Sequence, residues 1–212
     1  MRIAIGLLIA ATLSACAGSS NTADLPRRTA PVAPVAAAPP PAPVPATLTT
    51  TSDGRVVVQL GALRYAVRPP VGWTATPFRS TDRAAGTGDV YVVATPPGQP
   101  TSSVADLFVS FEVFDKSDRA PGVERKLANI GEERRARRAE FAIDRLAPVR
   151  LDDGRQAQLF LLRNNPSDEW EAIAFVDEGV TVAEMMLLGR ARADFDKAMP
   201  LFRDAVRSYR RL

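Results

Sequence analysis

Apolar residues in the second half of the chain fall into short runs separated by acidic turns that end in glycine. The four runs span residues 141–151, 155–163, 169–176 and 180–188. The turns between them read Asp-Asp-Gly at residues 152–154 and Asp-Glu-Gly at residues 177–179. Glycine supplies the positive φ angle that a tight connection between two strands needs. The pattern therefore predicts two consecutive β-hairpins.

The middles of these strands are almost continuously apolar, at residues 159–162, 173–176 and 185–188. A strand with one face in water alternates apolar and polar residues, whereas a strand covered on both sides does not. We therefore expect helices above and below this part of the sheet.

Two further pairs of strands are predicted before the hairpins. The first pair comprises residues 55–60 and 63–67, and the second comprises residues 89–95 and 106–115, with the turn-forming Pro-Pro-Gly between them. The strand at 63–67 ends at the prolines before Trp73, which we expect to be buried at that corner.

A helix is predicted to open at Pro121, a residue suited to the first helical position. Val123, Leu127 and Ile130 form one apolar stripe along it. Continuation of the helix would place Arg134 on that stripe, so we expect it to stop or bend near Gly131.

A second helical pattern closes the chain. Its apolar residues recur at intervals of three and four and are Phe195, Met199, Phe202, Val206 and Tyr209. Because proline lacks a backbone donor, Pro200 is expected to open a new helix after a short first one. Together these elements predict an α+β fold, a three-layer α/β/α sandwich around a mainly antiparallel sheet, over residues 48–212.

The N-terminal residues have the composition of a secretory signal, with Arg2 followed by about eleven apolar residues, too few to span a membrane. Leu13-Ser14-Ala15-Cys16 resembles the lipobox of bacterial lipoproteins. The resemblance implies removal of residues 1–15 and acylation of Cys16, the only cysteine in the chain. The alternative is an ordinary cleaved signal that happens to contain a cysteine.

Residues 16–47 are predicted to be a lipidated N-terminus and a tether. Seven prolines crowd its second half: Pro31, Pro34, Pro39, Pro40, Pro41, Pro43 and Pro45. Such a segment favours an extended, semi-rigid spacer, because proline fixes φ and donates no hydrogen bond. A proline-rich docking motif is the alternative, although no basic or aromatic residue stands among these prolines.

Two short motifs at the ends of the predicted domain suggest a family. Pro69-Pro70-Val71-Gly72-Trp73 closes an alternating strand, and the last helix carries Pro200, Phe202 and Ser208-Tyr209. Both patterns resemble those of the PsbP-like superfamily, which includes many bacterial lipoproteins. The resemblance implies a module that docks to larger assemblies rather than a catalyst.

The residues available for chemistry are few. The chain has no histidine, the usual general base and commonest metal ligand, and its one thiol is assigned to lipid. Asp194 and Asp196 lack the glycine and glutamate of a calcium loop and suit a helix start. We therefore expect no catalytic residues, no metal site and no cofactor.

The net charge of the chain limits the classes of partner that it is expected to bind. Removing residues 1–15 takes away one of 27 basic residues and none of the 24 acidic ones, which leaves a net charge near +2. This balance argues against nucleic acid as a partner. The densest charge cluster contains Arg134, Arg135, Arg137 and Arg138. Most such runs are solvated faces, but if the domain docks to an anionic partner, these four arginines are the expected contact.

These observations favour a membrane-tethered binding or accessory module of the cell envelope, without catalytic machinery. Its expected partners are the membrane, through the lipid anchor, and an envelope protein or anionic lipid. Ala17 follows Cys16 where some lipoproteins carry an inner-membrane retention aspartate. The expected location is therefore the periplasmic face of the outer membrane, with the inner membrane as the alternative. A weak hydrolase or lipid-handling protein is the competing function.

Overall fold

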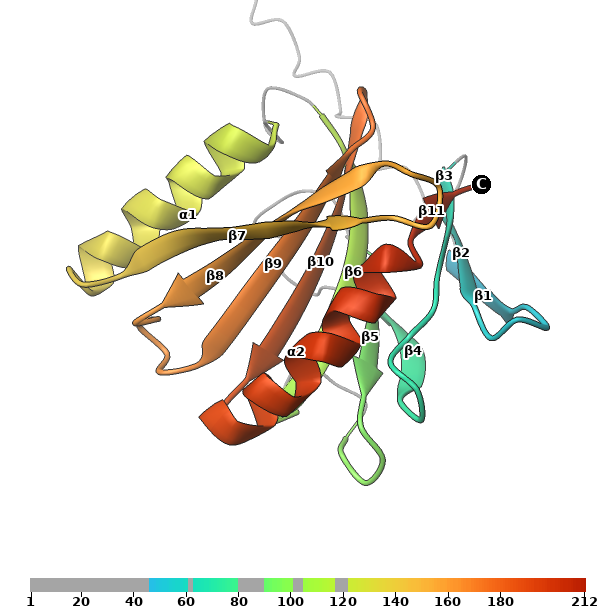
Figure 1. Cartoon of the computed structure of the whole chain (residues 1–212), viewed down its shortest axis with the longest axis horizontal. Coiled ribbons are helices and arrows are strands. Elements are labelled where there is room, and N and C mark those ends of the chain that lie inside the picture. Colours follow the sequence, from blue (N-terminus) through green and yellow to red (C-terminus); the bar gives the residue numbers. More distant parts are fainter. Residues whose placement is uncertain (1–45, 61–62, 80–89, 101–104, 117–121) are drawn as a thin grey trace, which may run out of the picture. The chain divides into compact units, whose positions relative to one another are not determined.

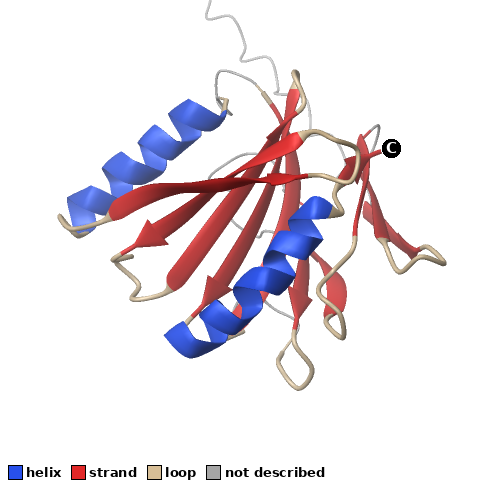
Figure 2. Cartoon of the chain, in the orientation of Figure 1, coloured by secondary structure: helices blue, strands red, loops and turns tan. Residues whose placement is uncertain are grey.

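Backbone pairing divides the described part of the chain into two antiparallel sheets. The computed structural model describes residues 46–60, 63–79, 90–100, 105–116 and 122–212. The chain separates into two units, Met1–Pro41 and Ala42–Leu212, and every described residue belongs to the second. Figure 1 traces the elements and Figure 2 colours them by type. The predicted signal peptide, Cys16 and nearly all of the predicted tether lie outside the described residues.

The larger sheet has seven strands in the order β4-β5-β6-β10-β9-β8-β7. They are β4 (Thr74–Arg79), β5 (Val90–Thr95), β6 (Leu107–Asp115), β7 (Ala142–Arg150), β8 (Gln156–Arg163), β9 (Trp170–Asp177) and β10 (Thr181–Gly189). Strands β7–β8 and β9–β10 are the two predicted hairpins, which are confirmed. Their turns hold Gly154 at φ +89° and Gly179 at φ +85°, as the turn residues indicated.

The smaller sheet has the order β1-β2-β3-β11. Its strands are β1 (Ala46–Thr50), β2 (Val56–Leu60), β3 (Leu63–Val67) and β11 (Arg210–Arg211). Strands β2 and β3 match the predicted ones, whereas β1, β4 and β11 were not predicted. Strand β4 contains Pro77 and lies at a sheet edge, where a strand tolerates a residue without a backbone donor.

Two helices lie against opposite faces of the larger sheet: α1 (Val123–Arg137) and α2 (Arg192–Arg207). The side chains of strand β9 alternate between the two faces of the sheet, so the strand contributes to two separate cores. Ala172 and Ala174 face the main core that contains α2, while Ile173 and Phe175 face a second core that contains α1. All four are buried, which confirms that this strand is covered on both sides.

The predicted three-layer α/β/α sandwich is wrong, because the domain is mostly β and its strands form two sheets. The smaller sheet packs on the same face of the larger sheet as α2, where Val58 and Tyr65 meet Phe202 in one core. Burial on both faces was read correctly from the sequence. The covering element on one face is partly a sheet, and an apolar pattern does not state what kind of element covers it.

The predicted stop near Gly131 is also wrong, since α1 continues to Arg137. Its start, predicted at Pro121, falls outside the described residues; the structure places Gly122 at the N-cap. The helix continues because Arg134, which interrupts the apolar stripe, meets a buried carboxylate on the sheet. The stripe is completed by an ion pair instead of a hydrophobic residue.

The expected break at Pro200 does not occur either, because α2 is one helix with this proline inside it. An interior proline costs about 3 kcal/mol. Phe195, Phe202 and Val206 are buried on the same helix, and each contributes about 1.5–3 kcal/mol. Burial of this face therefore outweighs the lost hydrogen bond.

Trp73 is less buried than predicted. It is half-buried at the corner after β3 and packs against the main core. The amide of Trp73 donates to the carbonyl of Pro70 at 3.0 Å, and Gly72 between them has φ +80°. The proline-glycine motif therefore forms a tight turn, and Trp73 is half-buried where the turn ends.

Candidate functional site

Arg134 is the member of the predicted arginine cluster that reaches into the domain. Its guanidinium pairs with both carboxylate oxygens of Glu171 on β9, with Nη2 3.2 Å from Oε1. Glu171 is buried and also accepts a hydrogen bond from Nδ2 of Asn165 at 2.9 Å. Burial raises the pKa of Glu171, although the hydrogen bonds from Arg134 and Asn165 oppose the shift. Arg134 thus supplies the positive charge that this buried carboxylate needs.

The other three arginines of the cluster differ in their contacts. Arg138 donates to the carbonyl of Asn165 at 2.9 Å and pairs with Asp168. Arg137 pairs with Glu133 at 2.9 Å, the local helix pair that their spacing of four suggests. Arg135 is exposed and has no side-chain hydrogen bond or ion pair among the described residues.

The four arginines therefore do not form a uniform cationic face, and contact with an anionic partner stays a prediction for this cluster. Arg134 turns towards the sheet, while Arg137 and Arg138 are each held by an acid. Arg135 alone among them has no acid or carbonyl partner within the described residues, and its guanidinium lies over the buried Gly131.

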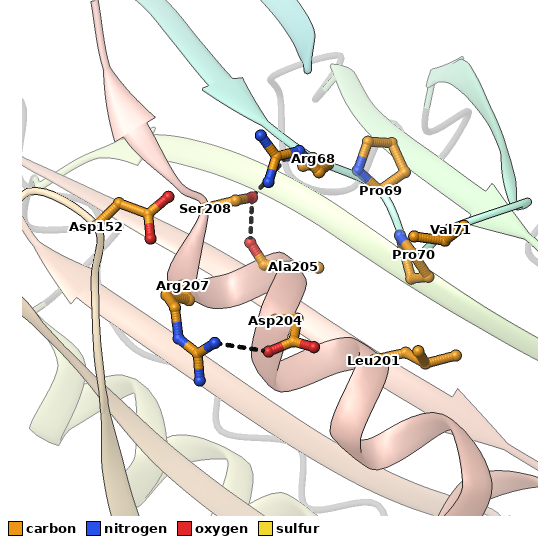
Figure 3. A pocket seen from close by; sticks show the side chains of 10 residues that line it. All are labelled: Arg68, Pro69, Pro70, Val71, Asp152, Leu201, Asp204, Ala205, Arg207 and Ser208. Carbon is orange, nitrogen blue, oxygen red and sulfur yellow. Dashed lines mark hydrogen bonds and ion pairs between the residues drawn. The ribbon is translucent and has the colours of Figure 1, made fainter. Parts of the chain in front are cut away.

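A cleft of about 310 Å³ lies between the turn after β3 and the C-terminal half of α2 (Figure 3). This cleft joins the two segments on which the family resemblance rests. The ten lining residues are Arg68, Pro69, Pro70, Val71, Asp152, Leu201, Asp204, Ala205, Arg207 and Ser208. Segments more than 120 residues apart in sequence thus share one site.

Ser208 fastens the two walls of this cleft to each other. Its hydroxyl donates to the carbonyl of Ala205 at 2.7 Å and accepts the backbone N–H of Arg68 at 2.7 Å. No general base contacts this hydroxyl among the described residues, and its proton is donated to the carbonyl of Ala205. Ser208 therefore has a structural role, because it ties the end of α2 to the chain after β3.

The charged side chains of the cleft have partners. Asp152 accepts from Nη2 of the buried Arg55 at 3.0 Å, and Asp204 accepts from Arg207 at 2.9 Å. Arg55 also pairs with Asp53, whose pKa falls to about 2 because Thr51 and Arg55 donate hydrogen bonds to it. Both acids that line the cleft are therefore paired with arginines.

Two apolar residues of the cleft face outward. Val71 is 86% exposed and Leu201 is 37% exposed, and both are large hydrophobic residues at its rim. Figure 3 shows both on the side of the cleft away from Asp152. The cleft therefore combines exposed apolar side chains at its rim with polar groups that are already hydrogen-bonded. Such a combination suits binding of a partner's side chain.

A second buried glutamate, Glu178, joins three segments of the domain. Its side chain is 3% exposed and accepts hydrogen bonds from Arg155 at 2.9 Å, Tyr209 at 2.9 Å, Arg211 at 3.1 Å and Thr181 at 3.2 Å. Burial alone would raise the pKa of Glu178, but these four donors outweigh it and lower the pKa.

Sequence reasoning treated Glu178 as an ordinary turn acid and missed this cluster. No local signal marks it, because Arg155, Tyr209 and Arg211 lie 23 to 33 residues away. The contacts tie the β7–β8 hairpin and the C-terminal strand to the β9–β10 turn, so their role is structural.

Within the described ranges, no three His, Cys, Asp or Glu side chains come close enough to hold a metal ion. In that same part of the chain, no helix has the length and apolar character needed to cross a bilayer. Its buried side-chain polar atoms all have hydrogen-bond partners.

Comparison with known proteins gave one kind of match. No protein-family model matches the chain, and no curated protein does. Among solved structures, the chain is similar to cyanobacterial PsbP (CyanoP) from Synechocystis sp. PCC 6803. The identity is 13%, the match covers 79% of this chain and 92% of that one, and the TM-score is 0.43. This neighbour is itself a PsbP protein, and membership of the PsbP-like superfamily stays a prediction for the present chain.

Proposed function

We propose that this chain is a lipid-tethered accessory module of the bacterial cell envelope, which binds a partner and carries no catalytic machinery. The anchor is Cys16, at the end of the lipobox-like segment, and the proline-rich residues after it serve as a spacer. The proposed location is the periplasmic face of the outer membrane.

The cleft between the Pro-Pro turn and α2 is the observation that carries the binding role. Its serine and its acids are engaged in structural hydrogen bonds, whereas Val71 and Leu201 stand exposed at its rim. A serine whose hydroxyl contacts only a backbone carbonyl and a backbone amide lacks the adjacent base that activates a nucleophile, while burial of exposed apolar side chains by a partner is favourable. This balance favours recognition over catalysis.

Cys16→Ser is expected to leave an uncleaved precursor and to abolish metabolic labelling with a fatty acid, because the hydroxyl cannot form the thioether. Labelling in a bacterial host, followed by electrophoresis, measures both effects. Ser19→Ala is the control, since it removes a nearby hydroxyl and keeps the thiol; it should be labelled and cleaved normally. Normal processing of Cys16→Ser would disprove the lipid anchor.

A photo-crosslinking amino acid at position 71 is expected to give a discrete adduct with one envelope protein in intact cells. The same amino acid at position 180 is the control, because Val180 is 73% exposed but lies in the β9–β10 turn. Leu201→Asp should remove the position-71 adduct, since a carboxylate at the rim opposes apolar contact. Equal adducts from positions 71 and 180, or none from 71, would contradict a binding role for the cleft.

A further inference from the structure

The outer face of the smaller sheet carries three arginines, two of which have no acidic partner among the described residues. Successive side chains on a strand point to opposite faces. Tyr65 and Val67 of β3 point into the main core, so Arg64 and Arg68 point outward. Arg210 of β11 pairs directly with Ala66 and shares that outward face. We call this surface the outer face; its residues are Thr47, Thr49, Val57, Gln59, Arg64, Ala66, Arg68 and Arg210.

Two of these arginines have no side-chain partner among the described residues. Arg64 and Arg210 are exposed, and neither has a side-chain hydrogen bond or ion pair among the described residues. The third, Arg68, lies 3.8 Å from the carboxylate of Asp53 in the β1–β2 turn. Ala66 is buried between them, as expected for a short side chain flanked by long ones.

The remaining exposed residues of the outer face are neutral donors, namely Thr47, Thr49 and Gln59. No residue of the outer face is acidic. The surface therefore combines forked guanidinium groups with hydroxyl and amide groups, the donors that phosphate oxygens accept.

We infer that the outer face docks onto anionic phospholipid headgroups of the membrane that holds the anchor. This inference rests on the proposed lipid tether. Strand β1, an edge strand of this same sheet, is where the described domain continues towards Cys16, 30 residues before Ala46. Even fully extended, that connection spans at most about 100 Å.

Because the tether confines the domain near the bilayer, a weak contact is sufficient to hold the outer face against the headgroups. A tethered site meets its target at roughly millimolar effective concentration. Two arginines and a few neutral donors can then hold the domain against the headgroups reversibly. In this bound orientation the sheet that bears the tether faces the lipid.

The test uses the mature chain, residues 16–212, with Cys16→Ser so that no acyl chain contributes. Cosedimentation is measured at roughly millimolar lipid, to match the effective concentration of the tethered site. One set of vesicles contains phosphatidylglycerol mixed with phosphatidylethanolamine, and the other contains phosphatidylcholine. We expect binding to the anionic vesicles alone, and its loss at about 1 M salt, where the Debye length falls to roughly 3 Å. Arg64→Gln with Arg210→Gln should weaken binding about 30-fold, since each arginine near an anionic surface contributes roughly fivefold.

Arg125→Gln with Arg150→Gln is the matched control. Arg125 lies on α1 and Arg150 ends β7; both are exposed and have no side-chain hydrogen bond or ion pair among the described residues, so this pair removes the same charge outside the outer face and outside the α1 arginine cluster. Its binding should stay within about twofold of the parent, and both variants should keep the parent melting temperature, because exposed unpaired charges contribute little to stability. An equal or greater loss in the control pair would overturn the inference.

Absence of vesicle binding by the parent would also overturn it and would point to an acidic protein as the partner of the outer face. Neither result bears on the anchor, which fatty-acid labelling of Cys16 tests separately.

Discussion

Arg134→Ala is expected to lower the free energy of unfolding by about 3 kcal/mol near neutral pH, because it leaves the buried Glu171 carboxyl group without its cationic partner. Breaking a buried pair costs about 3–5 kcal/mol, and the lower end applies here because the Arg134 side chain is 25% exposed. Denaturant unfolding followed by circular dichroism measures the change.

Two variants separate this electrostatic effect from loss of packing. Arg135→Ala removes the neighbouring exposed arginine and should change stability by less than about 0.5 kcal/mol. Glu171→Gln added to Arg134→Ala should recover most of the loss, since a neutral amide needs no counter-charge. If the double variant is no more stable than Arg134→Ala, the ion pair is not the cause.

The pH dependence of Arg134→Ala follows from the raised pKa of Glu171. A folded state with the higher pKa binds the proton more tightly than the unfolded chain, so this group favours folding at pH below its ordinary value of 4.5. That contribution is lost as the pH rises through the folded-state pKa. Removal of Arg134 raises the pKa further, so the variant should be less destabilised at acid pH than near neutrality.

Glu178→Gln is expected to lower the free energy of unfolding by about 2 kcal/mol, because hydrogen bonds to charged groups contribute about 1.5–3 kcal/mol each and the arginines can be partly resolvated. The amide keeps one acceptor but turns two N–H donors towards Arg155, Tyr209 and Arg211. The same unfolding measurement applies.

Asp177→Asn is the matched control, since Asp177 is adjacent in sequence and pairs with Lys116 at 2.6 Å but is 47% exposed. An exposed pair of this kind contributes about 0.2–1 kcal/mol. Equal destabilisation by the two substitutions would show that burial of Glu178 does not matter.

The two glutamates should respond to pH in opposite directions. The pKa of Glu178 is lowered in the folded state, so its contribution is present above its ordinary value of 4.5 and is lost as the pH falls through the folded-state pKa. Glu178→Gln should therefore lose less stability than the parent on acidification. A steeper acid loss in Glu178→Gln would contradict the assigned direction.

The local sequence determined the strands and turns of the two hairpins. Gly154 and Gly179 lie at positive φ angles that glycine adopts readily, and the apolar runs beside them are buried on both faces. The conformation of a turn depends on adjacent residues, and the face that a strand side chain occupies alternates every residue. Both can therefore be predicted from the order of residue types along the chain.

The tertiary structure decided where the helices end and which elements cover each other. The position of Arg134 on the apolar stripe predicted a stop near Gly131. The helix continues because Arg134 pairs with Glu171, 37 residues away. Pro200 argued for a break that the burial of Phe195 and Phe202 overrides. A residue's propensity acts locally, whereas the free energy that overrides it comes from burial against distant segments.

Both candidate surfaces of the protein also arise only in the folded state. The cleft joins the turn after β3 to the end of α2, and the outer face gains Arg210 when β11 pairs with β3. Side-chain alternation assigns Arg64 to the face opposite Tyr65 from sequence alone. That Arg210 stands beside it depends on strand order and register, which are set by packing between segments more than 140 residues apart.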